Sequence, residues 1–315
     1  MSMMGKPTIV LYARSATYGN APGLLQALRL SERFAPVGLV VANEDAYGFH
    51  RCRGVTVASA APRSARRLLW RADALWLCGA VSWSYLRRTL RDLGIAPRWS
   101  RKLVFLSDTY FMIHPWRAWT ALKEAGFAEP FFAMPDLMRF CPSGTPLYQP
   151  EPPLESVADD CRIVVGHSPG QRYPTRMGKK GTDAILRVVK SLQDHFEFEF
   201  DLMTGLSNAD CLQLKRRCHI FIDKVVDHTG GLGKSGLEAL ACGCAVVSSM
   251  QHTDAGDYPP PPVVPAATED ELWKAMMRLL ANASARDAAR AAAREWRHNL
   301  SYEATARRID RALSQ

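Results

Sequence analysis

The chain has 315 residues, of which 47% are hydrophobic and 23% charged, and it carries a formal net charge of +9. These fractions are typical of a folded globular protein and exclude an intrinsically disordered chain. At this length, two domains of about 150 residues each are the first expectation. The apolar runs are too short for a signal peptide or a membrane span, so we expect a cytoplasmic protein.

The cysteines and the positive charge narrow the class of protein further. Eight cysteines are scattered without a CxxC pair or neighbouring histidines, which predicts reduced thiols and no metal site. Much of the positive charge is arginine on predicted helix faces, as in residues 63–67 and 286–297. We expect most of it to be solvated, and we keep a second interpretation, in which it attracts an anionic membrane that carries a lipid-linked acceptor.

The first half of the chain alternates short apolar runs with helix-like segments, a pattern that predicts βαβ units and a parallel sheet. We expect a helix over residues 24–34 and strands over residues 8–13, 37–42, 74–78, 102–106 and 131–134. Turn-forming residues at 141–146 and 150–153 then predict a linker. The expected domains are therefore residues 1–150, an acceptor domain, and residues 151–315, a donor domain.

The second half repeats the same alternation. It predicts strands over residues 161–166, 197–203, 219–223, 245–249 and 263–264, with helices over 182–195, 208–217 and 235–242. Three more helices are expected over 269–280, 285–298 and 302–313, and we expect the final helices to pack back toward the N-terminal domain. The predicted fold is α/β, with two Rossmann-like domains facing across a cleft. Ligand sites in such sheets lie outside the carboxyl ends of the strands.

The most informative stretch is residues 222–249. An apolar strand ends at Asp223, a glycine-rich loop follows, and a helix begins near Ser235. Glycines allow backbone N–H groups to approach a phosphate, and the N-terminus of a helix attracts negative charge. Glu238, one turn into the helix, is expected to face the same site and to accept hydrogen bonds from ribose hydroxyls.

This stretch resembles the donor half of the retaining glycosyltransferases of the GT-B fold, in the glycosyltransferase group 1 family. The resemblance rests on Leu-Glu-Ala-Leu-Ala-Cys-Gly at 237–243 followed by Ala-Val-Val at 245–247. It continues upstream in His-Ser-Pro at 167–169, Lys-Gly-Thr at 180–182 and residues 201–205, and spans roughly residues 161–249. One departure is Gly230, where the family commonly has a second glutamate, and Asp223 or Asp227 are candidates to replace it.

The resemblance implies a nucleotide diphosphate sugar as donor substrate, with no separate cofactor. The expected catalytic residues are Lys180, Arg176, Glu238 and His114. Arg176 and Lys180 lie in a basic loop suited to a leaving diphosphate, and His114 follows a predicted strand at a place suited to acceptor contacts or acid/base work. The expected donor-binding residues are His167, Lys180, Gly181, Gly230, Gly231, Gly233, Ser235 and Glu238.

Each of these residues also has a structural interpretation, as a solvated basic turn, a helix-terminal carboxylate or a packed strand end.

Other classes of protein stay open as well. Gly-Lys-Ser at 233–235 imitates the end of a P-loop, but the glycine required five positions before Gly233 is His228. A nucleic-acid partner is not expected, because no recognition motif is present. A GT-B protein that binds a nucleotide sugar without catalysis is the main alternative to an enzyme acting on a glycan, lipid-linked or small-molecule acceptor.

Overall fold

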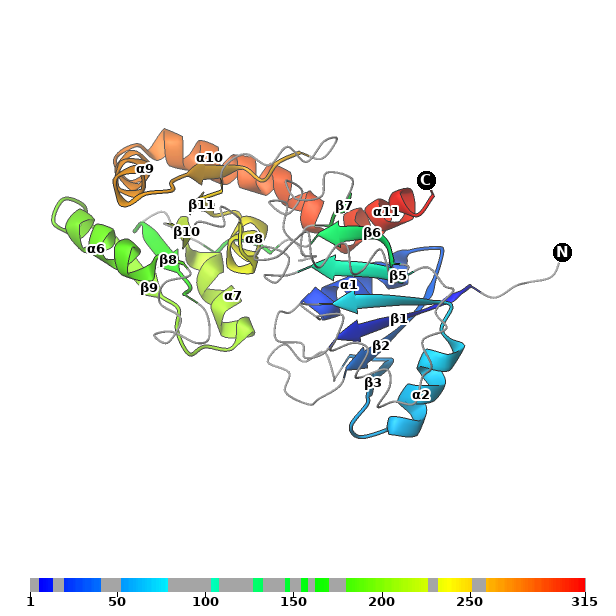
Figure 1. The fold of residues 1–315 in the computed structure, drawn as a ribbon. Coiled ribbons are helices and arrows are strands. Elements are labelled where there is room, and N and C mark those ends of the chain that lie inside the picture. The colour runs from blue at the N-terminus through cyan, green and yellow to red at the C-terminus, as the bar shows by residue number, and fades with distance from the viewer. Residues whose placement is uncertain are drawn as a thin grey trace. The chain divides into compact units, whose positions relative to one another are not determined.

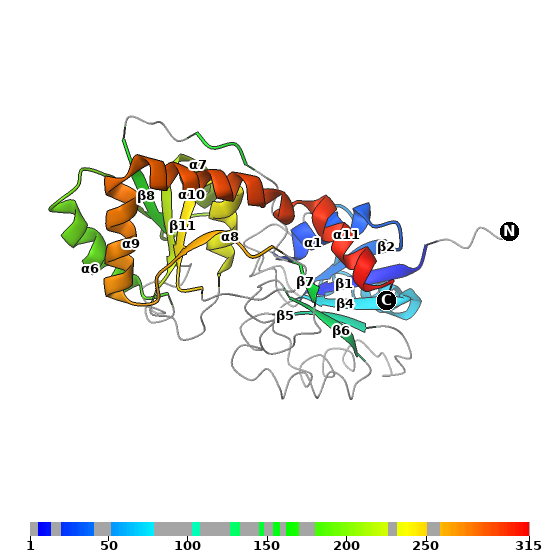
Figure 2. The same cartoon turned by 90° about the horizontal axis from the view of Figure 1, so that it is seen from above.

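The computed structural model describes residues 6–13, 20–40, 52–78, 103–107, 127–132, 145–147, 154–157, 162–169, 180–225, 232–250 and 259–314. The chain forms two compact units, drawn in Figures 1 and 2. Unit 1 comprises Met1–Pro150 together with Tyr302–Gln315, and unit 2 comprises Glu151–Ser301. Within the described ranges, no helix combines the length and the apolar character needed to cross a bilayer.

Unit 1 is built on a parallel sheet of seven strands in the order β3-β2-β1-β4-β5-β6-β7. The strands are β1 Thr8–Ala13, β2 Ala35–Val40, β3 Val55–Val57, β4 Ala74–Cys78, β5 Leu103–Ser107, β6 Phe127–Phe132 and β7 Thr145–Pro146. The order of the first six is the dinucleotide-fold order 3-2-1-4-5-6. The helices described in this part of the chain are α1 Asn20–Leu30 and α2 Pro62–Arg71.

The last helix of the chain, α11 Tyr302–Ala312, belongs to unit 1. It runs beside α1 in both views (Figures 1 and 2). Ile309 of α11 is buried in the core formed by β1, α1 and β4, and the Ser31 hydroxyl donates to the Asp310 carboxylate at 2.6 Å. The C-terminal helix is thus a structural part of the first unit rather than an appendage of the second.

Unit 2 is built on a parallel sheet of five strands in the order β12-β11-β10-β8-β9. The strands are β8 Val164–His167, β9 Glu199–Leu202, β10 Ile220–Lys224, β11 Ala245–Ser248 and β12 Val263–Pro265. The helices are α6 Thr182–Gln193, α7 Asn208–Arg217, α8 Lys234–Ala241, α9 Glu269–Ala281 and α10 Ala283–Trp296, and the short 3-10 helix η4 spans Arg297–Leu300. This is the other common doubly wound order, 2-1-3-4-5, in which the strand order reverses between β8 and β10.

Helices cover the buried central strands of unit 2 on both faces. All five residues of β10 are buried. Ile220 and Ile222 pack in the core that includes α6 and α9, whereas the Phe221 ring lies under Lys215 of α7, 5.3 Å from its ammonium nitrogen. Because side chains alternate along a strand, Asp223 follows Phe221 onto the face covered by α7 and α8.

The expected α/β fold with two Rossmann-like domains is confirmed, although several boundaries differ. β2, β5 and β6 begin up to four residues away from their predicted starts, and α1 begins and ends four residues before the helix predicted over 24–34. β3 and β7 were not predicted, because strands of three and two residues carry no periodic signal. β7 lies within residues 141–146, which were predicted to be part of a linker because they are rich in turn-forming residues.

Gly166 provides a test of the packing around the central strand β8. A Cβ at this position would lie 2.7 Å from Sγ of Cys218 and 2.9 Å from Cε of Met203. Gly166→Ala should therefore lower the free energy of unfolding by about 1–3 kcal/mol through overpacking, measured by denaturant titration. The double variant with Cys218→Ala should recover part of this loss, because it removes the nearest clashing atom. Purely additive effects of the two substitutions would contradict this account.

Candidate functional site

The candidate site lies where β8 and β10 end side by side in unit 2. His167, the last residue of β8, is in register with Ile222 of β10. This is the point at which the strand order reverses, and open α/β sheets bind their ligands outside the strand ends there. The register between β10 and β11 also shifts between Ile222 and Lys224, so that Asp223 is an extra residue in the ladder. Irregularities of this kind commonly re-aim a side chain beside a site.

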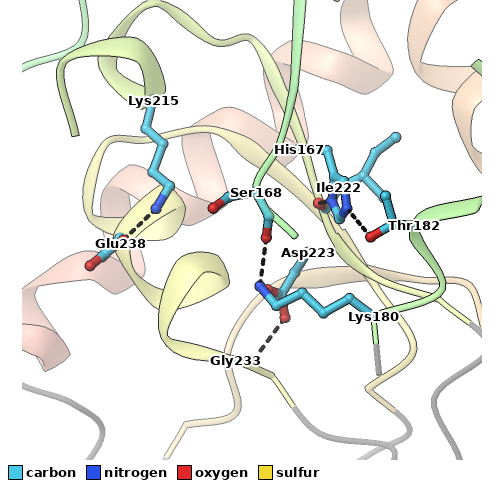
Figure 3. A network of polar contacts seen from close by, with 9 residues as sticks. All are labelled: His167, Ser168, Lys180, Thr182, Lys215, Ile222, Asp223, Gly233 and Glu238. Carbon is cyan, nitrogen blue, oxygen red and sulfur yellow. Dashed lines mark hydrogen bonds and ion pairs between the residues drawn. The ribbon is translucent and has the colours of Figure 1, made fainter. Parts of the chain in front are cut away.

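His167 ties three elements together under this edge (Figure 3). Its Nδ1 lies 2.7 Å from the Ile222 carbonyl oxygen and its Nε2 lies 3.0 Å from the Thr182 hydroxyl. Since a carbonyl can only accept, Nδ1 carries the proton and Nε2 accepts from Thr182. Burial, and then the charge of Lys180, lower the pKa of His167 to about 4. The ring is therefore neutral at neutral pH, and both of its nitrogens are engaged within the protein.

Lys180 reaches the same edge from the loop before α6. Its ammonium group donates to the Ser168 carbonyl at 2.9 Å and lies 3.4 Å from Oδ1 of Asp223. The side chain remains 20% exposed. Burial lowers the pKa of Lys180, nearby lysines act in the same direction, and Asp223 opposes them. Gly181 follows with φ of 66°, a left-handed conformation suited to glycine that turns the chain into α6.

Asp223 is fully buried beneath Lys180 and the start of α8. Its Oδ2 accepts the backbone N–H of Gly233 at 2.8 Å, while Oδ1 faces Lys180. Burial on its own would raise the pKa of Asp223, but Lys180, Lys224 and the Gly233 N–H together hold it below the usual value. The expectation that Asp223 could contact a donor sugar is therefore wrong, because its carboxylate is covered and both oxygens have protein partners.

Glu238 lies in α8 and is only 3% exposed. One carboxylate oxygen is paired with the equally buried ammonium group of Lys215, and the other accepts from Asn208 at 2.9 Å and lies 3.5 Å from Lys234. Burial on its own would raise the pKa of Glu238, but the two lysines and Asn208 hold it low. The carboxylate is thus held inside the protein, whereas the sequence had indicated a carboxylate that faces the ligand site. Its role toward ribose stays a prediction.

The remaining expected residues divide into two groups. Gly233 precedes α8 and Ser235 lies half-buried in its first turn, where N–H groups have no acceptor within the helix. Arg176, His114, Gly230 and Gly231 lie outside the described residues. Lys215 and Asn208 were missed, because a lysine within the run Leu-Lys-Arg-Arg at 214–217 looks like part of a solvated helix end.

The assembled side chains carry more positive than negative charge. Lys180, Lys215, Lys224 and Lys234 interact with one another or with the two carboxylates, Asp223 and Glu238. With His167 neutral, this group holds four lysines and two carboxylates. Together with the N-terminus of α8, the arrangement suits an anionic ligand such as a phosphate.

Comparison with known proteins gives a fold rather than a family. No protein-family model and no curated protein matches the sequence. Among solved structures, HepE of Anabaena in complex with UDP and glucose is 14% identical over 98% of this chain and 99% of its own, with a TM-score of 0.65. The UDP-GlcNAc 2-epimerase of Neisseria meningitidis bound to UDP-GlcNAc is 10% identical over 98% of this chain and 100% of its own, with a TM-score of 0.53.

A third similar structure is the O-GlcNAc transferase of Thermobaculum terrenum, 13% identical over 98% of this chain and 67% of its own, with a TM-score of 0.56. The chain has the GT-B fold. At these identities, the likeness establishes two Rossmann-like units and leaves the chemistry to be argued from the site.

The buried pair of Lys215 and Glu238 predicts how a substitution at Glu238 acts. Glu238→Ala leaves the Lys215 ammonium group buried without its principal counter-charge, and should lower the free energy of unfolding by about 3–5 kcal/mol. The double variant Lys215→Met, Glu238→Leu should regain most of this loss, because no charge is left buried. Denaturant titration of both variants measures the effect, and equal stability of Glu238→Ala and wild type would contradict the closed environment of the carboxylate.

Proposed function

We propose that the protein is a glycosyltransferase that moves a sugar from a nucleotide diphosphate sugar to an acceptor hydroxyl, with retention of configuration. The observation that carries the proposal is the partly exposed ammonium group of Lys180 at the β8/β10 strand ends, next to the N-terminus of α8 and at the point where the strand order reverses. A pyrophosphate is the ligand group that matches this charge and position best.

In the proposed reaction, the oxygen of the acceptor hydroxyl forms a bond to the anomeric carbon, and its proton passes to the departing pyrophosphate oxygen. The bond from that carbon to the pyrophosphate oxygen breaks, and the nucleoside diphosphate leaves with the electron pair. Lys180 stabilises the charge that develops on the pyrophosphate, with Arg176 and the loop at 230–233 as further contributors. Glu238 is assigned to the nucleoside side and His114 to the acceptor side.

The similar structures support a nucleotide-sugar ligand. The solved complexes hold UDP with glucose, UDP-glucose or UDP-GlcNAc, and another is an α-glucosyltransferase with UDP and DNA, with a TM-score of 0.58. Epimerases share the fold at comparable TM-scores, and a glycine replaces the family's second glutamate at Gly230. Epimerisation, or binding without turnover, is therefore a defined alternative for the experiment to detect.

Lys180 provides the binding test. Thermal shift with UDP-, GDP- and ADP-sugars should identify one nucleotide class that stabilises the wild type. Lys180→Met should remove most of that shift, because it deletes the charge nearest the proposed pyrophosphate position. Lys190→Met is the matched control, since Lys190 is an exposed residue of α6, the helix that follows Lys180. A shift that survives Lys180→Met unchanged would exclude this site.

The same ligand then separates turnover from binding. Slow release of free sugar and nucleoside diphosphate from the stabilising nucleotide sugar supports a transferase that uses water in place of its acceptor. A changed sugar that is still attached to its nucleotide identifies an epimerase, and stabilisation without any reaction identifies a binder.

We further propose that helix α2 contacts an anionic membrane surface, where a lipid-linked acceptor would lie. Its four arginines and its tryptophan are exposed on one arc of the helix, opposite the buried Ala65 and Leu69: Arg63, Arg66, Arg67, Trp70 and Arg71. The Trp70 side chain is 69% exposed in the middle of these arginines, and α2 has no acidic residue. An indole flanked by basic residues fits the headgroup region of an anionic bilayer.

Vesicle co-sedimentation tests this contact. Each arginine near an anionic surface contributes about 1 kcal/mol, so Arg63→Gln with Arg67→Gln should weaken binding to phosphatidylglycerol vesicles by about tenfold or more. Trp70→Ala should weaken it independently. The charge-matched control is Lys190→Gln with Arg278→Gln, two exposed residues of unit 2. Equal losses in the α2 and control variants, or equal binding to neutral vesicles, would refute the assignment.

A further inference from the structure

The buried carboxylate of Asp223 joins the two parts of the candidate site that the proposed function assigns to the pyrophosphate. One oxygen lies 3.4 Å from the Lys180 ammonium group, and the other accepts from the N–H of Gly233 at 2.8 Å. Lys180 precedes α6 and Gly233 precedes α8, so a single side chain links the loops that begin two different helices. Figure 3 shows Asp223 between these two partners.

Two glycines at the start of α8 pack closely against the Asp223 carboxylate. A Cβ on Gly233 would lie 3.2 Å from Oδ1 of Asp223, and a Cβ on Gly236 would lie 3.0 Å from Cγ of Asp223 and 2.4 Å from Cδ1 of Leu232. The glycines at the start of α8 therefore bring its backbone against the carboxylate. Asp223 lies at the end of β10, where the register with β11 shifts.

Lys180 keeps one donor beyond its two protein partners. An ammonium group has three N–H donors, and the described contacts of Lys180 use one toward the Ser168 carbonyl and one toward Asp223. Two anchors from different strands fix the position of the nitrogen while the side chain stays partly exposed. Such a group is preorganised for an anion, since little reorientation is needed when the anion arrives.

We propose that Asp223 is a positioning residue for the nucleotide pyrophosphate: it holds the Lys180 ammonium group and the start of α8 together without touching the ligand itself. The inference rests on the proposed function and adds a residue to it. Asp223 acts through Lys180 in two ways. It fixes where the ammonium nitrogen lies, and it supplies the negative charge that favours the protonated form of this amine.

The protonation of Lys180 follows from the groups around it. Burial lowers the pKa of Lys180 most, and Asp223 is the counter-charge that opposes this. The titratable groups that interact with Lys180 come from three elements, namely Asp223 and Lys224 of β10, Lys215 and Cys211 of α7, and His167 of β8. Asp223 is the one among these groups that favours the charged amine. Asp223→Asn therefore moves the pKa of Lys180 further down while leaving an amide oxygen to accept from Gly233.

The experiment is a calorimetric titration of the full chain with UDP between about pH 6 and about pH 9. Asp223→Asn should bind UDP at least about tenfold more weakly than wild type at the alkaline end. It should recover toward wild type at the acid end, where Lys180 is protonated again. Asp201→Asn is the matched control, because it removes a carboxylate from the neighbouring part of the sheet, at β9, where Asp201 faces Arg217. It should keep the wild-type pH profile.

Two results would overturn the proposal. A wild-type pH profile in Asp223→Asn would show that Asp223 does not act through the charge of Lys180. Tighter UDP binding at every pH would show that the carboxylate competes with the ligand instead of positioning its partner.

The double variant Lys180→Met, Asp223→Asn covers the case in which Asp223→Asn fails to fold. It leaves no unpaired buried charge from this pair, and its UDP affinity should equal that of Lys180→Met alone. A further tenfold loss in the double variant would mean that Asp223 acts by another route, which contradicts the proposal.

Labelling of Lys180 separates this proposal from the proposed function. The pH dependence of its acylation, followed by mass spectrometry without ligand, should move to lower pH in Asp223→Asn. Failure of the wild type to bind UDP or any other nucleoside diphosphate would refute the proposed function, whereas an unmoved labelling profile would refute the role of Asp223.

Discussion

The ion pair of Lys180 and Asp223 is the interaction on which the candidate site depends. The strand order of unit 2 reverses between β8 and β10, so the chain leaves their ends in different directions. A fully buried carboxylate at that point is costly unless every oxygen has a partner. Lys180 and the Gly233 N–H meet this need. By doing so, they fix the loops that precede α6 and α8 at the place where this fold accommodates ligands.

Two buried ion pairs in unit 2 differ in how far their charged groups are exposed. Lys215 and Glu238 are nearly inaccessible, with Asn208 and Lys234 completing the shell around the carboxylate. Lys180 is a fifth exposed and keeps a donor beyond its described partners. Because a buried pair adds little net stability, the inner pair serves to hold α7 against α8. The outer pair holds a charge where an anion can reach it.

The sequence predicted most of the fold, but not the geometry of the site. Alternating apolar runs indicated both parallel sheets, whereas the order of the strands depends on pairings that no local pattern records. Lys180 was identified from its motif. Glu238 was expected to face the site from one turn inside the helix, yet it is covered by residues 23 and 30 positions away in the chain. Asp223 was expected to face a sugar, and only the packing of Gly233 and Gly236 reveals that it faces inward.

These contacts bear on Gly230, the position at which the glycosyltransferases that the sequence resembles commonly carry a second glutamate. Asp223 cannot supply the missing carboxylate to a donor sugar, since both of its oxygens serve Lys180 and Gly233. The proposed function assigns Lys180 to the pyrophosphate rather than to the sugar, because the ammonium group is charged and sugars are neutral. On this proposal, nucleotide binding and sugar transfer depend on different parts of the chain. A variant that abolishes turnover while leaving UDP affinity intact would be expected outside the Lys180 and Asp223 pair.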